Sequence, residues 1–243
     1  MAELSDPVVI VGATGGIATA LAGRLHAAGR PLHLVARDAA ALAVLADRFG
    51  ATSAVADAMD GDALAAAVRQ AGPRIAGLAY CVGSIVMTPV KRATEATFVD
   101  AFRLNAVGAA LAVAAAADAL RAAEGSVVLF STVAARAGFA NHTVISAAKG
   151  AVEGLTVALA AELAPHVRVN AIAPSLTRTA IAAPLTGNEA MARAIAAQHP
   201  IPRLGEADDS ASLAAFLLGP DAGWITGQIF GVDGGRSTVR SRG

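Results

Sequence analysis

The chain has 243 residues, of which 55% are hydrophobic, and its 19 Lys and Arg balance its 19 Asp and Glu. A chain of this length suits one sizeable domain, and its zero net charge argues against binding to nucleic acid or to an anionic membrane. The single cysteine, Cys81, excludes an internal disulfide, and the five scattered histidines show no metal-ligand spacing. Because the N-terminus is acidic and the apolar runs are short, we expect a cytoplasmic protein, outside the membrane, with a small-molecule partner.

Short apolar and β-branched runs alternate with long alanine-rich segments of helical pattern. Seven runs are predicted to be strands, at 8–11, 32–36, 51–56, 75–80, 126–131, 168–172 and 228–232. Two long helices are expected at about 94–121 and 143–163. This alternation indicates βαβ units, and therefore a parallel sheet of an α/β fold with helices on both faces.

Residues 180–205 interrupt the alternation. The segment reads AIAAPLTGNEAMARAIAAQHPIPRLG and contains three prolines and one short helical pattern. Loops held on a rigid scaffold often shape binding sites. We therefore expect a mobile flap over a substrate pocket, within a single domain that spans residues 1–243.

The sequence GATGGIA, residues 12–18, lies between the first strand and the helix that follows it. Gly12 permits a tight turn, and Gly16 lets the backbone approach a pyrophosphate, which the helix N-terminus attracts. A glycine-rich turn without a ligand is the alternative. The position at the start of a βαβ unit favours a dinucleotide site.

The second predicted strand ends in LVARD and bears on the choice of cofactor. An acidic residue at the strand end would accept hydrogen bonds from a ribose 2′-hydroxyl, but Ala36 stands there and Arg37 suits a 2′-phosphate. Asp38 would favour NAD if it folded back, although a residue so placed is more often a helix cap. The pattern favours NADP (NADPH), with NAD possible.

Over nearly its whole length the chain resembles the classical short-chain dehydrogenase/reductase (SDR) family. The resemblance rests on motifs in family order: the glycine turn, ADAMD with Asp57, YCVG at 80–83, LNAVG with Asn105, GSVVLFST, RVNAIAPSLTRT and ITGQIFGVDGG. It implies a seven-stranded, doubly wound Rossmann-type sheet. It also implies cofactor contacts from Gly12, Thr14, Gly15, Gly16, Ile17, Arg37, Asp57, Ala58, Cys81, Gly83, Asn105, Lys149, Pro174, Thr177 and Thr179.

The family's catalytic residues carry over only in part. Counting back from Lys149, the tyrosine place of the YxxxK motif is Ile145, and the serine place thirteen residues earlier is Thr132. In the family the tyrosine exchanges a proton with the substrate oxygen, the serine orients that oxygen, the lysine binds the nicotinamide ribose, and the asparagine, here Asn105, holds a water. Thr132 keeps a hydroxyl, but isoleucine can move no proton.

Several residues are candidates for the missing proton donor. His142 lies at the tyrosine place of the enoyl-reductase branch, and would share a helix face with Ile145 if the helix began near Asn141; a solvated structural histidine is the alternative. Tyr80 and Cys81 are expected to be packing residues. Thr179 is expected to bond the nicotinamide carboxamide or a phosphate, or else to cap a helix.

Three functions remain open at this point. The chain is an NADP(H)-dependent oxidoreductase with an altered proton donor, acting on a small carbonyl, imine or activated alkene. Alternatively it is a catalytically impaired cofactor sensor, or the partner subunit of an active relative. The alanine-rich helices also favour a homo-oligomer, a dimer or a homotetramer.

Overall fold

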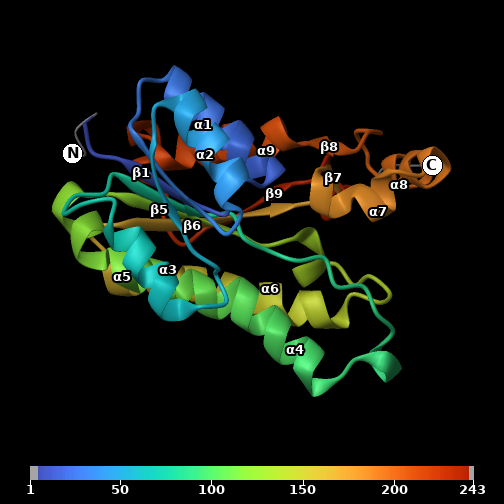
Figure 1. Ribbon diagram of the computed structural model, residues 1–243. Helices are drawn as coiled ribbons and strands as arrows, with labels where there is room; N and C mark the ends of the chain where they lie inside the picture. Colours follow the sequence, from blue (N-terminus) through green and yellow to red (C-terminus); the bar gives the residue numbers. More distant parts are fainter. Residues whose placement is uncertain (1–4, 241–243) are drawn as a thin grey trace.

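The computed structural model describes residues 5–240 (Figure 1). Its main sheet has seven parallel strands in the order β3-β2-β1-β4-β5-β6-β9. The order reverses direction beside β1, as in a doubly wound sheet, so the predicted fold class is confirmed. The strands are β1 (Val8–Val11), β2 (Leu32–Ala36), β3 (Thr52–Val55), β4 (Gly77–Tyr80), β5 (Ser126–Phe130), β6 (Arg168–Pro174) and β9 (Ile229–Val232).

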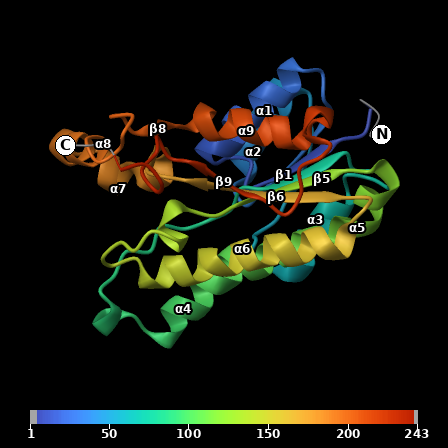
Figure 2. The ribbon, with the colours of Figure 1, turned by 180° about the vertical axis from the view of Figure 1, so that it is seen from behind.

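Helices cover both faces of this sheet (Figures 1 and 2). One layer holds α1 (Gly16–Ala27), α2 (Ala39–Phe49) and α9 (Ala207–Leu218), and the other holds α3 (Gly61–Arg69), α5 (Gly108–Ala123) and α6 (Thr143–Leu163). Along β1, Val8 and Ile10 belong to the core of the first layer, and Val9 and Val11 to that of the second. Successive side chains of a strand face opposite sides, so a strand buried on both sides is apolar throughout.

The predicted helix over 94–121 is interrupted. It consists of α4 (Glu95–Phe102), a π-helical segment over Arg103–Val107, and α5. Tyr80 is 2% exposed, and its hydroxyl donates a hydrogen bond to the Leu104 carbonyl inside the π segment at 2.7 Å. The wider π turn leaves carbonyl groups outside the regular i→i−4 hydrogen bonds of an α-helix. The contact that Tyr80 makes from β4 could not be predicted from helical periodicity.

Two stretches, Glu95–Ala123 and Thr143–Leu163, are long and apolar enough to cross a membrane by length and composition alone. The short apolar runs of the sequence did not predict this. Both stretches contribute buried residues, such as Val113 and Val152, to the core beneath the sheet. Core helices of folded domains have the same composition, so the finding is weak support for a membrane location.

The flap segment begins and ends at a second, two-stranded sheet. In it β7 (Thr177–Arg178) pairs in parallel with β8 (Gly205–Glu206). Between them lie a 3-10 turn at Ala180–Ala182, α7 (Ala183–Thr186) and α8 (Glu189–Ala196), beyond the end of the main sheet (Figure 1). The β7–β8 pairing fixes the base of the flap, while its mobility stays a prediction.

Tyr80 also determines which residue can begin α5. A Cβ atom at Gly108 would overlap the Tyr80 hydroxyl oxygen and would lie 3.2 Å from the Ala58 carbonyl oxygen. Tyr80 cannot move away easily, because its hydroxyl is bonded and its ring is buried. A glycine is therefore required at position 108 for steric reasons.

We expect Gly108→Ala to lower the free energy of unfolding by about 1–3 kcal/mol, since the added methyl overpacks a rigid contact. Gly23→Ala in α1 is the matched control, because a Cβ there meets no atom within 4 Å. The control should be neutral or stabilising by up to about 1 kcal/mol. Urea unfolding of both variants measures the difference, and equal responses would contradict the packing argument.

Candidate functional site

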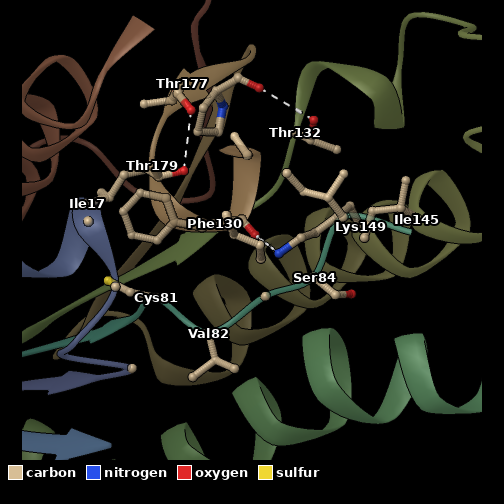
Figure 3. A pocket seen from close by; sticks show the side chains of 18 of the residues that line it. Ile17, Cys81, Val82, Ser84, Phe130, Thr132, Ile145, Lys149, Thr177 and Thr179 are labelled. Carbon is tan, nitrogen blue, oxygen red and sulfur yellow. Dashed lines mark hydrogen bonds between the residues drawn. The ribbon is translucent and has the colours of Figure 1, made fainter. Parts of the chain in front are cut away.

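A cavity of about 760 Å³ opens at the carboxyl ends of the strands (Figure 3). The turn after β1, the segments that follow β2, β3, β4, β5 and β6, and the flap all contribute to its lining. The residues predicted from sequence come together here, with Asn105 the exception. Those that line the cavity are Gly12, Thr14, Gly15, Gly16, Ile17, Arg37, Asp57, Ala58, Cys81, Gly83, Thr132, His142, Ile145, Lys149, Pro174, Thr177 and Thr179.

The glycine turn is tightly packed against the end of β4 and against β7. Gly12 has a φ of 80°, and a Cβ atom there would lie 2.9 Å from Cγ2 of Val82. A Cβ at Gly16 would lie 2.9 Å from Cγ2 of Thr179. Glycine at both positions therefore leaves bare backbone at the cavity wall, where α1 starts with unpaired N–H groups. Such a turn fits a pyrophosphate.

At the end of β2 the Arg37 guanidinium lines the cavity, whereas the Asp38 carboxylate is engaged in capping α2. Asp38 accepts a hydrogen bond from the Ala41 N–H at 3.0 Å and so caps α2, as its position predicted. Arg37 is exposed and lines the cavity. At the end of β3, Asp57 lines the cavity and accepts a bond from the Met59 N–H at 2.9 Å. The strand ends thus offer one guanidinium and one carboxylate to a ligand.

Lys149 lies deep in the cavity, 6% exposed, and its ammonium donates to the Phe130 carbonyl at 2.7 Å (Figure 3). Burial lowers the pKa of Lys149 to about 8, and the nearby Cys81 thiol partly opposes this shift. Among the described residues Lys149 forms no ion pair. A lysine so placed can lose or gain its proton near neutral pH.

Asn105 is buried behind Gly83, which lines the cavity. Its side-chain nitrogen donates to the Ala101 carbonyl at 2.8 Å and to Ser84 Oγ at 3.2 Å. Its buried oxygen Oδ1 has no hydrogen-bond partner within residues 5–240. Asn105 Oδ1 and Lys149 Nζ each lie 3.2 Å from the place of a Cβ on Gly83. An unpaired buried acceptor beside an ammonium is suited to a water or a ligand hydroxyl.

Thr132 and Ile145 form the wall near Lys149 (Figure 3). The Thr132 hydroxyl accepts from the Ala134 N–H at 3.3 Å and lies 3.4 Å from the Pro174 carbonyl oxygen. Ile145, 4% exposed, lies one helical turn before Lys149 on α6 and offers only hydrocarbon. The wall therefore carries one hydroxyl and no acidic hydrogen at position 145.

His142 lines the cavity and is partly exposed. Its Nδ1 is 2.7 Å from the Ala140 carbonyl oxygen, and its ring packs edge-on against Phe139 at 5.5 Å between centroids. Helix α6 starts at Thr143, as expected, and Asn141 has a φ of 65°, so the condition under which His142 and Ile145 would share a helix face is not met. His142 and Ile145 nevertheless line the same cavity.

Three further expectations have clear outcomes. Tyr80 is buried, and burial raises its pKa, so it is a packing residue as predicted. Cys81 is partly exposed and lines the cavity, and burial raises its thiol pKa to about 12. Thr179 makes no capping bond; its hydroxyl donates to the Thr177 carbonyl at 3.3 Å (Figure 3). Thr179 thus stands at the N-cap position of the 3-10 turn Ala180–Ala182, as in the helix-cap alternative, but without a capping bond from its side chain.

Sequence reasoning missed a polar group on the flap side of the cavity. Ser175 and Arg236 line the cavity, and Ser175 Oγ is 2.8 Å from Nε2 of the buried His199. The Arg236 guanidinium stacks on the ring of Phe139, 4.6 Å from its centroid. These residues come from four separate segments, so no local spacing marks them.

Comparisons with known proteins agree with this geometry. A family described as Enoyl-(Acyl carrier protein) reductase matches residues 12–237. Galactitol 2-dehydrogenase (L-tagatose-forming) of Cereibacter sphaeroides is 34% identical, over 93% of this chain and 92% of its own.

Two solved structures are also similar. A short-chain type dehydrogenase/reductase from Mycobacterium ulcerans has a TM-score of 0.91 and 29% identity, covering 99% of this chain and 92% of its own. A gluconate 5-dehydrogenase from Burkholderia cenocepacia, in complex with NADP and tartrate, has a TM-score of 0.90 and 25% identity, covering 96% of each chain. With the Rossmann-type sheet and the cavity at its strand ends, these matches show that the chain belongs to the short-chain dehydrogenase/reductase family of oxidoreductases.

Proposed function

We propose that the chain is an NADP(H)-dependent oxidoreductase that moves hydride to or from a small carbonyl, imine or activated alkene. One observation carries the proposal: the glycine turn, Thr132 and Lys149, far apart in sequence, line a single cavity. The cofactor supplies or accepts the hydride. The NADP complex of the similar gluconate 5-dehydrogenase supports this choice of cofactor.

The residues present fit a dinucleotide with a 2′-phosphate. The bare backbone at Gly12 and Gly16 would receive the pyrophosphate. Arg37 would bind the 2′-phosphate as a planar fork, and Asp38 would not repel it, because its carboxylate already caps α2. Asp57 would accept from the adenine amino group.

Lys149 and Asn105 would hold the sugar beside the reacting carbon. The Lys149 ammonium, still charged below about pH 8, would donate to the nicotinamide ribose hydroxyls. The unpaired Oδ1 of Asn105 would hold a water at the gap beside Gly83. Thr177 and Thr179 would contact the nicotinamide end, and Thr132 would orient the substrate.

The proton donor must differ from the family's phenol if Ile145 occupies the tyrosine place. A positioned general acid contributes roughly 10²–10⁴-fold in rate, so its loss slows ordinary ketone reduction without excluding hydride transfer. His142, which lines the cavity, is the candidate side-chain donor. The similarity to dehydrogenases and reductases supports a catalytically active enzyme rather than a cofactor sensor or a partner subunit.

We also propose a cytoplasmic homo-oligomer. Apolar side chains remain uncovered on the outer sides of α4, α5 and α6, where Val99, Phe102, Leu111 and Val157 are 40% to 52% exposed. A second copy of the chain would cover them, because alanine-rich helices permit close packing.

Arg37→Gln should weaken NADPH binding by roughly 10- to 100-fold, since it removes a charge-assisted contact to the 2′-phosphate. NADH binding should change little. Arg69→Gln is the control, because Arg69 is exposed at the end of α3 and does not line the cavity. Fluorescence titration with both nucleotides decides, and equal loss for NADPH and NADH would overturn the assignment of Arg37.

The affinity for NADPH should fall by about tenfold between pH 7 and pH 9. Lys149 is protonated below its pKa of about 8 and neutral above it, so raising the pH removes one charged donor. The Lys149→Met variant should bind NADPH weakly, and its affinity should not change with pH. Lys91, the other lysine of the chain, is exposed, so the Lys91→Met variant should keep the wild-type dependence of NADPH affinity on pH. A persistent pH dependence in Lys149→Met would assign the titration to another group.

Ile145→Tyr should raise the rate of ketone reduction by roughly 10²-fold or more, because it restores a phenol one turn before Lys149. Ile181→Tyr is the control, since it adds a phenol to the same cavity but on the flap. Steady-state reduction of a panel of simple ketones with NADPH measures both. A wild type as fast as Ile145→Tyr would show that the proton donor is already present.

A further inference from the structure

Arg236 lies in the chain segment after β9 and faces the flap side of the cavity. The residue is half-buried, and burial lowers the pKa of its guanidinium, which the nearby Asp233 partly opposes. Among residues 5–240 Arg236 has no ion-pair partner. A cation that has given up part of its hydration without gaining an anion is a candidate for ligand binding.

The groups that touch this guanidinium are neutral. Nη2 donates to Gln198 Oε1 at 2.6 Å, Nη1 lies 3.5 Å from Ser175 Oγ, and the ring of Phe139 stacks at 4.6 Å. Three neutral side chains therefore contact the guanidinium. A guanidinium has five N–H donors, so donors remain for a bidentate partner.

The nearby carboxylate of Asp233 is already engaged. It accepts from the Gly235 N–H at 2.9 Å, from the Ser237 N–H at 3.0 Å and from the Ser237 hydroxyl. Asp233 does not line the cavity. It stabilises the turn that carries Arg236 and leaves the cavity side of the cation unopposed.

Within residues 5–240 no acidic side chain lines this end of the cavity beside Arg236. Of the described lining residues, Asp57 alone carries a carboxylate. Asp57 follows β3 and Arg236 follows β9, and these are the two opposite edge strands of the sheet. The flap side of the cavity is lined largely by apolar side chains, among them Phe139, Ile181, Leu185 and Ile195. Arg236 is the cation that an anion would meet on that side.

Arg236 is also close to the proposed site of hydride transfer. Its neighbour Ser175 follows Pro174, whose carbonyl oxygen lies 3.4 Å from the Thr132 hydroxyl. A chain of short contacts thus joins the guanidinium to the hydroxyl that would orient the substrate.

We propose that Arg236 binds a carboxylate of the substrate, so that the substrate is a small carboxylic acid whose carbonyl, imine or alkene group lies near Thr132. This inference rests on the proposed oxidoreductase function and narrows its substrate class. The carboxylate would form a bidentate pair with the guanidinium, at the end of the cavity away from Asp57.

The test uses three keto acids in which the ketone lies progressively farther from the carboxylate, 2-oxobutyrate, acetoacetate and levulinate, each beside its uncharged methyl ester. Calorimetric titration of the full chain, with and without NADPH, should show one acid or more binding at least about tenfold more tightly than its ester. If the wild type binds every ester as well as its acid, the inference is overturned without any variant.

Variants then locate the anchor. Arg236→Gln should weaken acid binding by roughly 10- to 100-fold and leave ester and NADPH binding unchanged, while Arg236→Lys keeps part of the preference. Arg240→Gln, at an exposed arginine four residues along that does not line the cavity, should behave as wild type. Undiminished acid binding by Arg236→Gln would overturn the inference. Absence of NADPH binding alone would instead overturn the proposed function.

Discussion

Burial of the main sheet on both faces is the constraint on which the rest of the structure depends. Every residue of β1 is at most 1% exposed, so helices must cover both sides and each crossover must return the chain to the same end of the sheet. The segments that follow the parallel strands therefore lie together at the carboxyl end of the sheet. The cavity, the glycine turn and the predicted polar residues lie there for this reason.

The same burial sets the electrostatic character of the site. Lys149 is buried, with one carbonyl contact and no carboxylate partner among residues 5–240, and this burial lowers its pKa. Arg236 is likewise surrounded by neutral partners at the other end of the cavity. Two cations that pay a desolvation cost without a protein anion are better explained by ligand binding than by stability.

Local sequence features predicted what depends on neighbouring residues. The seven strands, the turn at 12–18 and the Asp38 cap could be predicted because each follows from residues within a few positions. The start of α6 at Thr143 was predicted in the same way. The break in the long helix at Arg103–Val107 could not be predicted, because it involves a hydroxyl from β4 and so depends on more than helical periodicity.

The sequence by itself determined the α/β class, the family resemblance and the place of isoleucine before Lys149, because periodicity and motif spacing are properties of order along the chain. Only the tertiary structure decided which charges face the cavity. The cluster around Arg236 joins residues that are far apart in the sequence, namely Ser175, Phe139 and His199. Their burial depends on how the helices pack, which no local sequence pattern describes. Desolvation and unpaired donors arise from packing in three dimensions, which is why the substrate anchor could not be predicted from the sequence.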